Sequence, residues 1–201
     1  LRQPRLLLIY VITALGYGGT FTAFTFLAPI LEKITGFDSN AIGLIMLVYG
    51  VSVAIGNIVG GKMADKMGPV KALTIIFSGL ACILIVFNFT LVNPITAVVT
   101  ILIWGAFAFG NVPGLQLYLV TLAQKYTPDA VGTASGLNIA AFNIGIALGA
   151  WGGGLIVAKV GLIHTPWIGA VIVLLALALT RLSGKLDERT INQQHPTLAS
   201  G

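Results

Sequence analysis

The chain has 201 residues, of which 57% are hydrophobic and only 8% are charged, and its mean hydropathy is +0.98. A composition this apolar excludes a soluble globular domain and is typical of membrane-spanning helices, each of which needs about 20 consecutive apolar residues. The net charge of +5 is therefore interpreted as a signal of membrane topology rather than of nucleic-acid binding. The apolar runs are continuous and do not alternate with polar residues, which excludes a transmembrane β-barrel.

Charged residues divide the sequence into uncharged runs that predict the membrane spans. The longest run, residues 72–124, exceeds one helix and is interrupted at 88–94 by the turn-rich stretch NFTLVNP, so it predicts two spans. Pro166 and the interfacial aromatic residue Trp167 open the last span. Together the runs predict six helices, at residues 6–31, 40–61, 72–91, 95–122, 132–157 and 165–181.

The C-terminal segment 183–201, SGKLDERTINQQHPTLASG, is polar and contains proline and glycine. This composition predicts a disordered cytoplasmic tail after a six-helix bundle at residues 1–182. The single cysteine, Cys82, lies inside an apolar run, so no disulfide is expected within the chain.

The basic residues are distributed unequally between the two sides that six alternating spans define. Two of the eleven, Lys33 and Lys159, fall on one side. The other nine fall on the opposite side: Arg2, Arg5, Lys62, Lys66, Lys71, Lys125, Arg181, Lys185 and Arg189. Because cytoplasmic loops are rich in lysine and arginine, this split predicts an integral membrane protein with both ends of the chain in the cytoplasm.

Two segments of the sequence resemble each other at an offset of 93 residues. AIGNIVGGKMADKMG, at 54–68, and ALGAWGGGLIVAKVG, at 147–161, are identical at six of fifteen positions. The match relates the second and fifth spans, so it predicts two three-helix units, at about 1–93 and 94–182. Because three is odd, the second unit must be inverted in the membrane. The predicted fold class is thus an all-α membrane protein with two inverted three-helix repeats, an arrangement typical of secondary transporters.

The segment GGKMADKMGPVK, at 60–71, resembles the signature loop of the major facilitator superfamily. Its main positions are filled by Gly61, Asp65, Lys66, Gly68 and Lys71. Lys66 stands where arginine is common in that family, and Pro69 stands where a basic residue is common. Three further segments are similar to helices seven, ten and eleven of the drug:H+ antiporter group, in the arabinose-efflux-permease-like branch: YGGTFTAFTFLAPIL (17–31), WGAFAFGNVPGLQ (104–116) and GLNIAAFNIGIALGAWGGGL (136–155).

This resemblance covers about residues 1–185 and implies the C-terminal half of a twelve-span transporter, whose partner is an N-terminal six-helix half outside this chain. It implies alternating-access transport of a small solute in the bacterial inner membrane, with proton-coupled efflux of a sugar-like, nucleoside-like or drug-like compound. It also implies that the 60–71 loop is a gate latch. The lysines of this loop are explained by topology alone, but Asp65 is not, since a carboxylate adds nothing to a positive-inside signal.

The spans carry neutral polar side chains, and none has Asp, Glu, Lys, Arg or His near its middle. Any proton-coupling residue is therefore expected in the N-terminal half, because a charge kept at the bilayer centre usually serves function. Pro113 is expected to loosen the backbone of the fourth span. The resemblance also implies that the first, second, fourth and fifth spans correspond to the helices that line the substrate cavity in this family. The candidate substrate-cavity residues are Tyr17, Thr20, Asn111, Gln116, Asn138 and Asn143.

Each of these side chains could instead bond across a helix interface. A six-helix scaffold or receptor subunit without transport activity is the alternative function. An intramembrane serine protease is disfavoured because Ser135 and His164 would lie on opposite sides of a bilayer about 30 Å thick. No HExxH motif or pair of intramembrane carboxylates is present, so no metal, cofactor or enzymatic activity is expected.

Overall fold

The computed structural model describes residues 3–194, with side chains through Asp187, and it contains six helices long and apolar enough to cross a membrane. This number agrees with the six predicted spans. The first span, Pro4–Thr35, is continued past α1 by two short elements. The helices are α1 Pro4–Phe24, α2 Leu27–Ile30, the π-helix η1 Leu31–Thr35, α3 Ser39–Met67, α4 Pro69–Thr90, α5 Pro94–Tyr126, the 3-10 helix η2 Pro128–Ala130, α6 Val131–Lys159, the 3-10 helix η3 Leu162–His164, and α7 Thr165–Gln194.

Local sequence signals set the ends of these helices. The Asp38 carboxylate accepts a bond of 2.8 Å from the Ala41 amide at the start of α3, and Asn93 caps α5 in the same way. Pro69 and Pro94 occupy the first turns of α4 and α5, where a missing N–H costs nothing. Gly68, with φ of +81°, is the only residue between α3 and α4.

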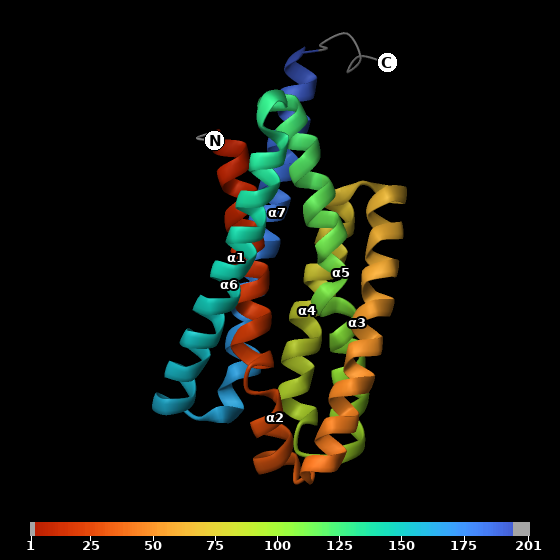
Figure 1. The fold of residues 1–201 in the computed structure, drawn as a ribbon, viewed down its shortest axis with the longest axis vertical. Coiled ribbons are helices and arrows are strands. Elements are labelled where there is room, and N and C mark those ends of the chain that lie inside the picture. Colours follow the sequence, from red (N-terminus) through yellow and green to blue (C-terminus); the bar gives the residue numbers. More distant parts are fainter. Residues whose placement is uncertain (1–2, 195–201) are drawn as a thin grey trace.

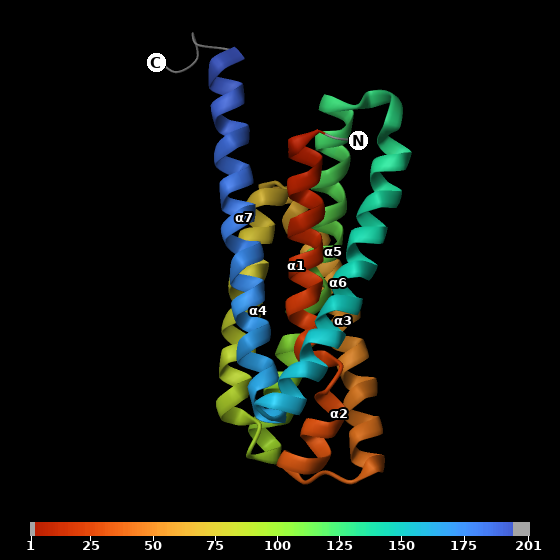
Figure 2. The same ribbon diagram turned by 90° about the vertical axis from the view of Figure 1, so that its left-hand side faces the viewer.

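The long helices run alternately in opposite directions and confirm the inverted repeat (Figure 1). In the first unit α1 descends, α3 ascends and α4 descends; in the second, α5 ascends, α6 descends and α7 ascends (Figures 1 and 2). The starts of α1, α4 and α6 and the ends of α3, α5 and α7 therefore lie together. This end, which carries Arg5, Lys66, Lys71 and Lys125, is termed the basic end. Lys33 and Lys159 lie at the other.

The two units repeat one close helix contact. Gly56 and Gly60 of α3 lie against the backbone of Ala106 and Gly110 of α5, and a Cβ on either glycine would collide with that backbone. In α6, Gly149 and Gly153 meet the backbone of α1 in the same way, at Gly18 and Thr22. The α3 and α6 glycines are 93 residues apart, and their partners on α1 and α5 are 88 apart. The sequence repeat thus records a repeated backbone contact.

The segment after residue 182 differs from the sequence-based expectation. Helix α7 continues to Gln194, so residues 183–194 are helical and not a disordered tail. The reason is a set of polar contacts: Ser183 and Asp187, one turn apart, bond to side chains of α1 and α5. The rest of the predicted tail, residues 195–201, lies outside the described residues.

Helix α5 is continuous through Pro113, where the sequence predicted a loosened backbone. The proline leaves the Phe109 carbonyl without its usual helical donor, because proline has no N–H. The Pro113 ring also faces Gly61 of α3: a Cβ placed on Gly61 would lie 3.7 Å from the ring carbons. An alanine at Gly61 would therefore make an ordinary van der Waals contact with the ring, so the approach of Pro113 to α3 does not depend on this glycine.

Candidate functional site: a polar pocket and the basic end

A pocket of about 370 Å³ lies between α1, α3, α5 and α6. It receives side chains from both three-helix units. None of its lining residues is charged, as the charge-free spans predicted. The pocket is lined by Thr13, Tyr17, Asn57, Phe109, Val112, Leu115, Gln116, Asn138, Ile139 and Phe142.

Three of the six predicted cavity residues meet in this pocket: Tyr17, Gln116 and Asn138. Tyr17 is 2% exposed, and its ring packs edge-on against Phe142 with centroids 4.1 Å apart. The hydroxyl of Tyr17 has no hydrogen-bond partner among the described residues, so it is available to a ligand. The Gln116 amide donates to the Ser135 hydroxyl at 3.2 Å, which links α5 to α6.

Asn138 is buried and is held by a residue that the sequence analysis did not select. The Thr13 hydroxyl donates to the Asn138 carbonyl oxygen at 2.8 Å and joins α1 to α6. This bond fixes the amide and leaves its N–H₂ group without a partner in the described part of the chain. Thr13 could have been identified from the sequence as a pocket residue, because it lies four residues before Tyr17 and therefore on the same face of α1.

The other three predicted cavity residues do not line the pocket. The Thr20 hydroxyl is buried and donates to the Gly16 carbonyl of its own helix at 2.9 Å. Asn143 is exposed and donates to the Ile139 carbonyl, also within its own helix. Asn111 is fully buried, and neither its amide nitrogen nor its oxygen has a partner in the described residues. The spacing of polar residues along each helix could not by itself distinguish Thr20, Asn111 and Asn143 from the residues that line the pocket.

The predicted gate-latch segment is mostly helical. Asp65 and Lys66 lie in the last turn of α3 and are exposed, and Lys71 lies in the first turn of α4. Asp65 does not cap α4, whose N-cap is Gly68 without a side-chain bond. Within the described part of the chain Asp65 has no ion pair. Any ion-pair partner of the Asp65 carboxylate therefore lies outside the described residues.

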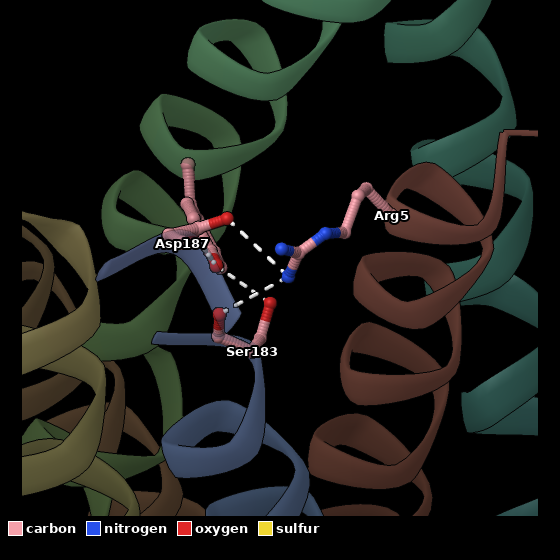
Figure 3. Close-up of polar contacts among 4 residues, drawn as sticks. Arg5, Ser183 and Asp187 are labelled. Carbon is pink, nitrogen blue, oxygen red and sulfur yellow. Dashed lines mark hydrogen bonds and ion pairs between the residues drawn. The ribbon is translucent and has the colours of Figure 1, made fainter. Parts of the chain in front are cut away.

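A second polar cluster at the basic end was missed by the sequence analysis (Figure 3). Arg5 reaches from α1 to Asp187 of α7 at 3.4 Å and to the Ser183 carbonyl oxygen at the same distance. The Tyr118 hydroxyl of α5 bonds to Asp187 at 2.5 Å and lies 2.6 Å from the Ser183 hydroxyl. The cluster thus ties three helices together. It was missed because Ser183 and Asp187 fell in the segment expected to be disordered.

Six spans arranged as two inverted triplets, with a neutral polar pocket shared between them, are the architecture of half a secondary transporter.

Comparison with known proteins places the chain within that class. Residues 6–199 match the Major Facilitator Superfamily, and the chain belongs to this family. It is 50% identical to an uncharacterized MFS-type transporter, YtbD, of Bacillus subtilis (strain 168). That alignment extends over 187 residues and covers 93% of this chain and 47% of the relative. It is 34% identical over 194 residues to the inner membrane transport protein YdhP of Escherichia coli (strain K12), covering 95% and 48%.

A more distant relative carries a name that includes a substrate class. The chain is 26% identical over 178 residues, covering 88% of it and 44% of the relative, to a probable sugar efflux transporter of Helicobacter acinonychis (strain Sheeba). In all three comparisons the chain spans about half the length of the relative.

Proposed function

We propose that this chain forms the C-terminal half of a twelve-span transporter that moves a small solute by alternating access. The repeated contact between α3 and α5 and between α1 and α6 supports this, since inverted units are the basis of alternating access in such folds. The half-length match to the relatives also supports it, because the N-terminal six-helix half would close the pocket from the other side.

The pocket favours an uncharged solute with hydroxyl or amide groups and an apolar face. The free N–H₂ group of Asn138 and the hydroxyl of Tyr17 would form hydrogen bonds, and the Phe109 and Phe142 rings would contact the apolar face. This chemistry suits sugar-like, nucleoside-like and many drug-like compounds. Proton-coupled efflux is the proposed mode, with the protonatable group supplied by the N-terminal half.

The α3–α4 turn is proposed as a gate latch on the cytoplasmic side. Asp65 is exposed and has no ion pair within the described residues, so its carboxylate is free to bind a cation or a helix N-terminus of the other half. Contacts of this kind need to differ between access states by only a few kcal/mol to shift their populations. The topology behind the proposal follows from the excess of basic residues at this end.

The experiment is a transport assay of the complete protein in proteoliposomes with a panel of labelled sugars, nucleosides and cationic drugs. Replacing Asn138 with Ala is expected to raise KM for the transported compound about tenfold, the effect of ~1.4 kcal/mol of lost binding. The matched control is Asn143→Ala, because that amide is exposed and bonds only to its own helix. Equal effects of the two changes would contradict the pocket assignment, and no transport of any compound would favour the scaffold alternative.

Orientation is tested by cysteine labelling in a Cys82→Ala background. Single cysteines at Lys66 and Lys33 are expected to react from opposite sides of the membrane, with Lys66 on the cytoplasmic side. Labelling of both from the same side would contradict the inverted arrangement of the two units.

A further inference from the structure

A second hollow lies on the opposite side of α3 from the polar pocket. It is a groove of about 220 Å³ between α3, α4 and α5, and every side chain that lines it is apolar. Asn57 faces the polar pocket, whereas Val59, two residues later and about 200° round the helix, lines the groove. The groove residues are Ile55, Gly56, Val59, Gly60, Met63, Ile75, Ile76, Ala106, Phe107 and Gly110.

The close contact between α3 and α5 creates this groove. Gly56, Gly60 and Gly110 contribute backbone and no side chain, so they form a floor between walls of larger residues. The outer wall is open: Ile55 is 54% exposed and Ile75 is 47% exposed. In a membrane-spanning bundle, an open apolar groove of this kind accepts hydrocarbon, because lipid chains are as apolar as the side chains around it.

Two lysines stand at one mouth of the groove. Lys66 lies three residues beyond Met63 on α3, and Lys71 lies four residues before Ile75 on α4, so each continues a groove-lining face by one turn to the basic end. Both side chains are exposed, and neither has an ion pair among the described residues.

The acidic residues nearby do not neutralise this mouth. Asp65 is two residues after Met63 and therefore points about 200° away from the groove face of α3. Asp187 borders a separate hollow at the α3–α4 turn together with Lys71, but its carboxylate is held by Arg5 and Tyr118. Among the described residues, neither Lys66 nor Lys71 therefore has its charge neutralised by an ion pair.

We propose that this groove binds an anionic phospholipid, with one acyl chain along the glycine floor and the phosphate between Lys66 and Lys71. Basic residues at the interfacial end of an apolar groove between transmembrane helices are the chemistry that recognises an anionic headgroup. A zwitterionic lipid would supply the same acyl chain but no net negative charge. The site is separate from the polar pocket and does not depend on the transported solute.

The test compares two lipids that have identical acyl chains and different headgroups. The complete protein in detergent is titrated with dioleoyl-phosphatidylglycerol or dioleoyl-phosphatidylcholine, and bound lipid is counted by native mass spectrometry. Phosphatidylglycerol is expected to bind more tightly. The double variant Lys66→Gln/Lys71→Gln is expected to weaken its binding about 30-fold, as expected for two lysines lost near an anionic headgroup, and to leave phosphatidylcholine unchanged.

The matched control is Lys125→Gln, which removes an exposed lysine at the basic end in the last turn of α5, away from the groove. A second variant, Val59→Trp, fills the groove from an exposed position and is expected to reduce the binding of both lipids. If the double variant keeps the preference for phosphatidylglycerol, or if Val59→Trp retains lipid as well as the unmodified protein, the proposal fails. Equal losses in the double variant and in Lys125→Gln would also overturn it.

Discussion

The α3–α4 turn of the first unit and the turn after α6 in the second unit occupy equivalent places at opposite ends of the bundle. Each turn contains a glycine with positive φ, 81° at Gly68 and 113° at Gly161, and these glycines are related by the 93-residue offset. Each is also preceded by a lysine two residues earlier. Only the first turn has a carboxylate, Asp65, where the second has Ala158. The comparison shows that the repeat preserves the backbone geometry and the lysine, while the carboxylate is specific to the basic end.

The largest expected effect comes from breaking the geometry that the units share. Gly60→Ala in α3 and Gly149→Ala in α6 each place a methyl group into the backbone of a neighbouring helix. Each change is expected to cost about 1–3 kcal/mol of stability, because a tight contact must be forced apart. Thermal unfolding in detergent provides the measurement.

Each glycine variant has a matched control on its own helix. A Cβ at Gly50 in α3 or at Gly152 in α6 meets nothing within 4 Å, so alanine there should leave the melting temperature unchanged or raise it slightly. If only one of the two buried variants is destabilised, the units do not share the contact in the way their geometry indicates.

The next effect is expected at Asp65, the carboxylate for which the second unit has Ala158. Asp65→Asn in the complete protein is expected to lower transport about tenfold, which corresponds to ~1.4 kcal/mol in the balance of access states. Membrane insertion and yield should be unchanged, because Asp65 is exposed and makes no ion pair within the described residues. Asp129→Asn, an exposed carboxylate in η2 at the same end, serves as the control. Normal flux in the Asp65 variant would remove the gating role.

An effect of similar size, on stability and not on transport, is expected at the polar cluster that joins the first helix of one unit to the last helix of the other. Arg5→Gln leaves Asp187 without its ion-pair partner and should cost ~1–2 kcal/mol, between the values for exposed and buried pairs. Lys185→Gln, an exposed neighbour on α7, should change the melting temperature little. Equal melting temperatures for the two variants would show that the cluster contributes nothing to docking α7.

The smallest effect is expected for the bond between the units inside the pocket. Thr13→Val removes the donor to Asn138 and should cost about 0.6 kcal/mol, the average for hydrogen bonds between transmembrane helices. Thr121→Val is the control, because its hydroxyl is exposed and bonds to its own helix. A loss above about 2 kcal/mol would indicate a role in packing larger than that of an ordinary interhelical bond.

Residues near the membrane interfaces show where sequence reasoning was limited. Composition resolved the spans but could not show that α3 continues through Asp65 to Met67, because charged residues end a hydropathy signal without ending a helix. The same limit explains the error at residues 183–194. These residues are polar in sequence, yet Ser183 and Asp187 find partners on α1 and α5 and the helix continues.

The sequence by itself determined the number of spans, their alternation and the inversion of the two units, because these follow from hydrophobic length, from the distribution of basic residues and from an odd repeat. The tertiary structure alone decided which polar side chains share a pocket. Tyr17, Gln116 and Asn138 meet there, while Thr20 and Asn143 bond to their own helices. The physical reason is that the rotation of each helix about its axis is set by contacts such as Gly149 against Gly18, which join residues far apart in the chain.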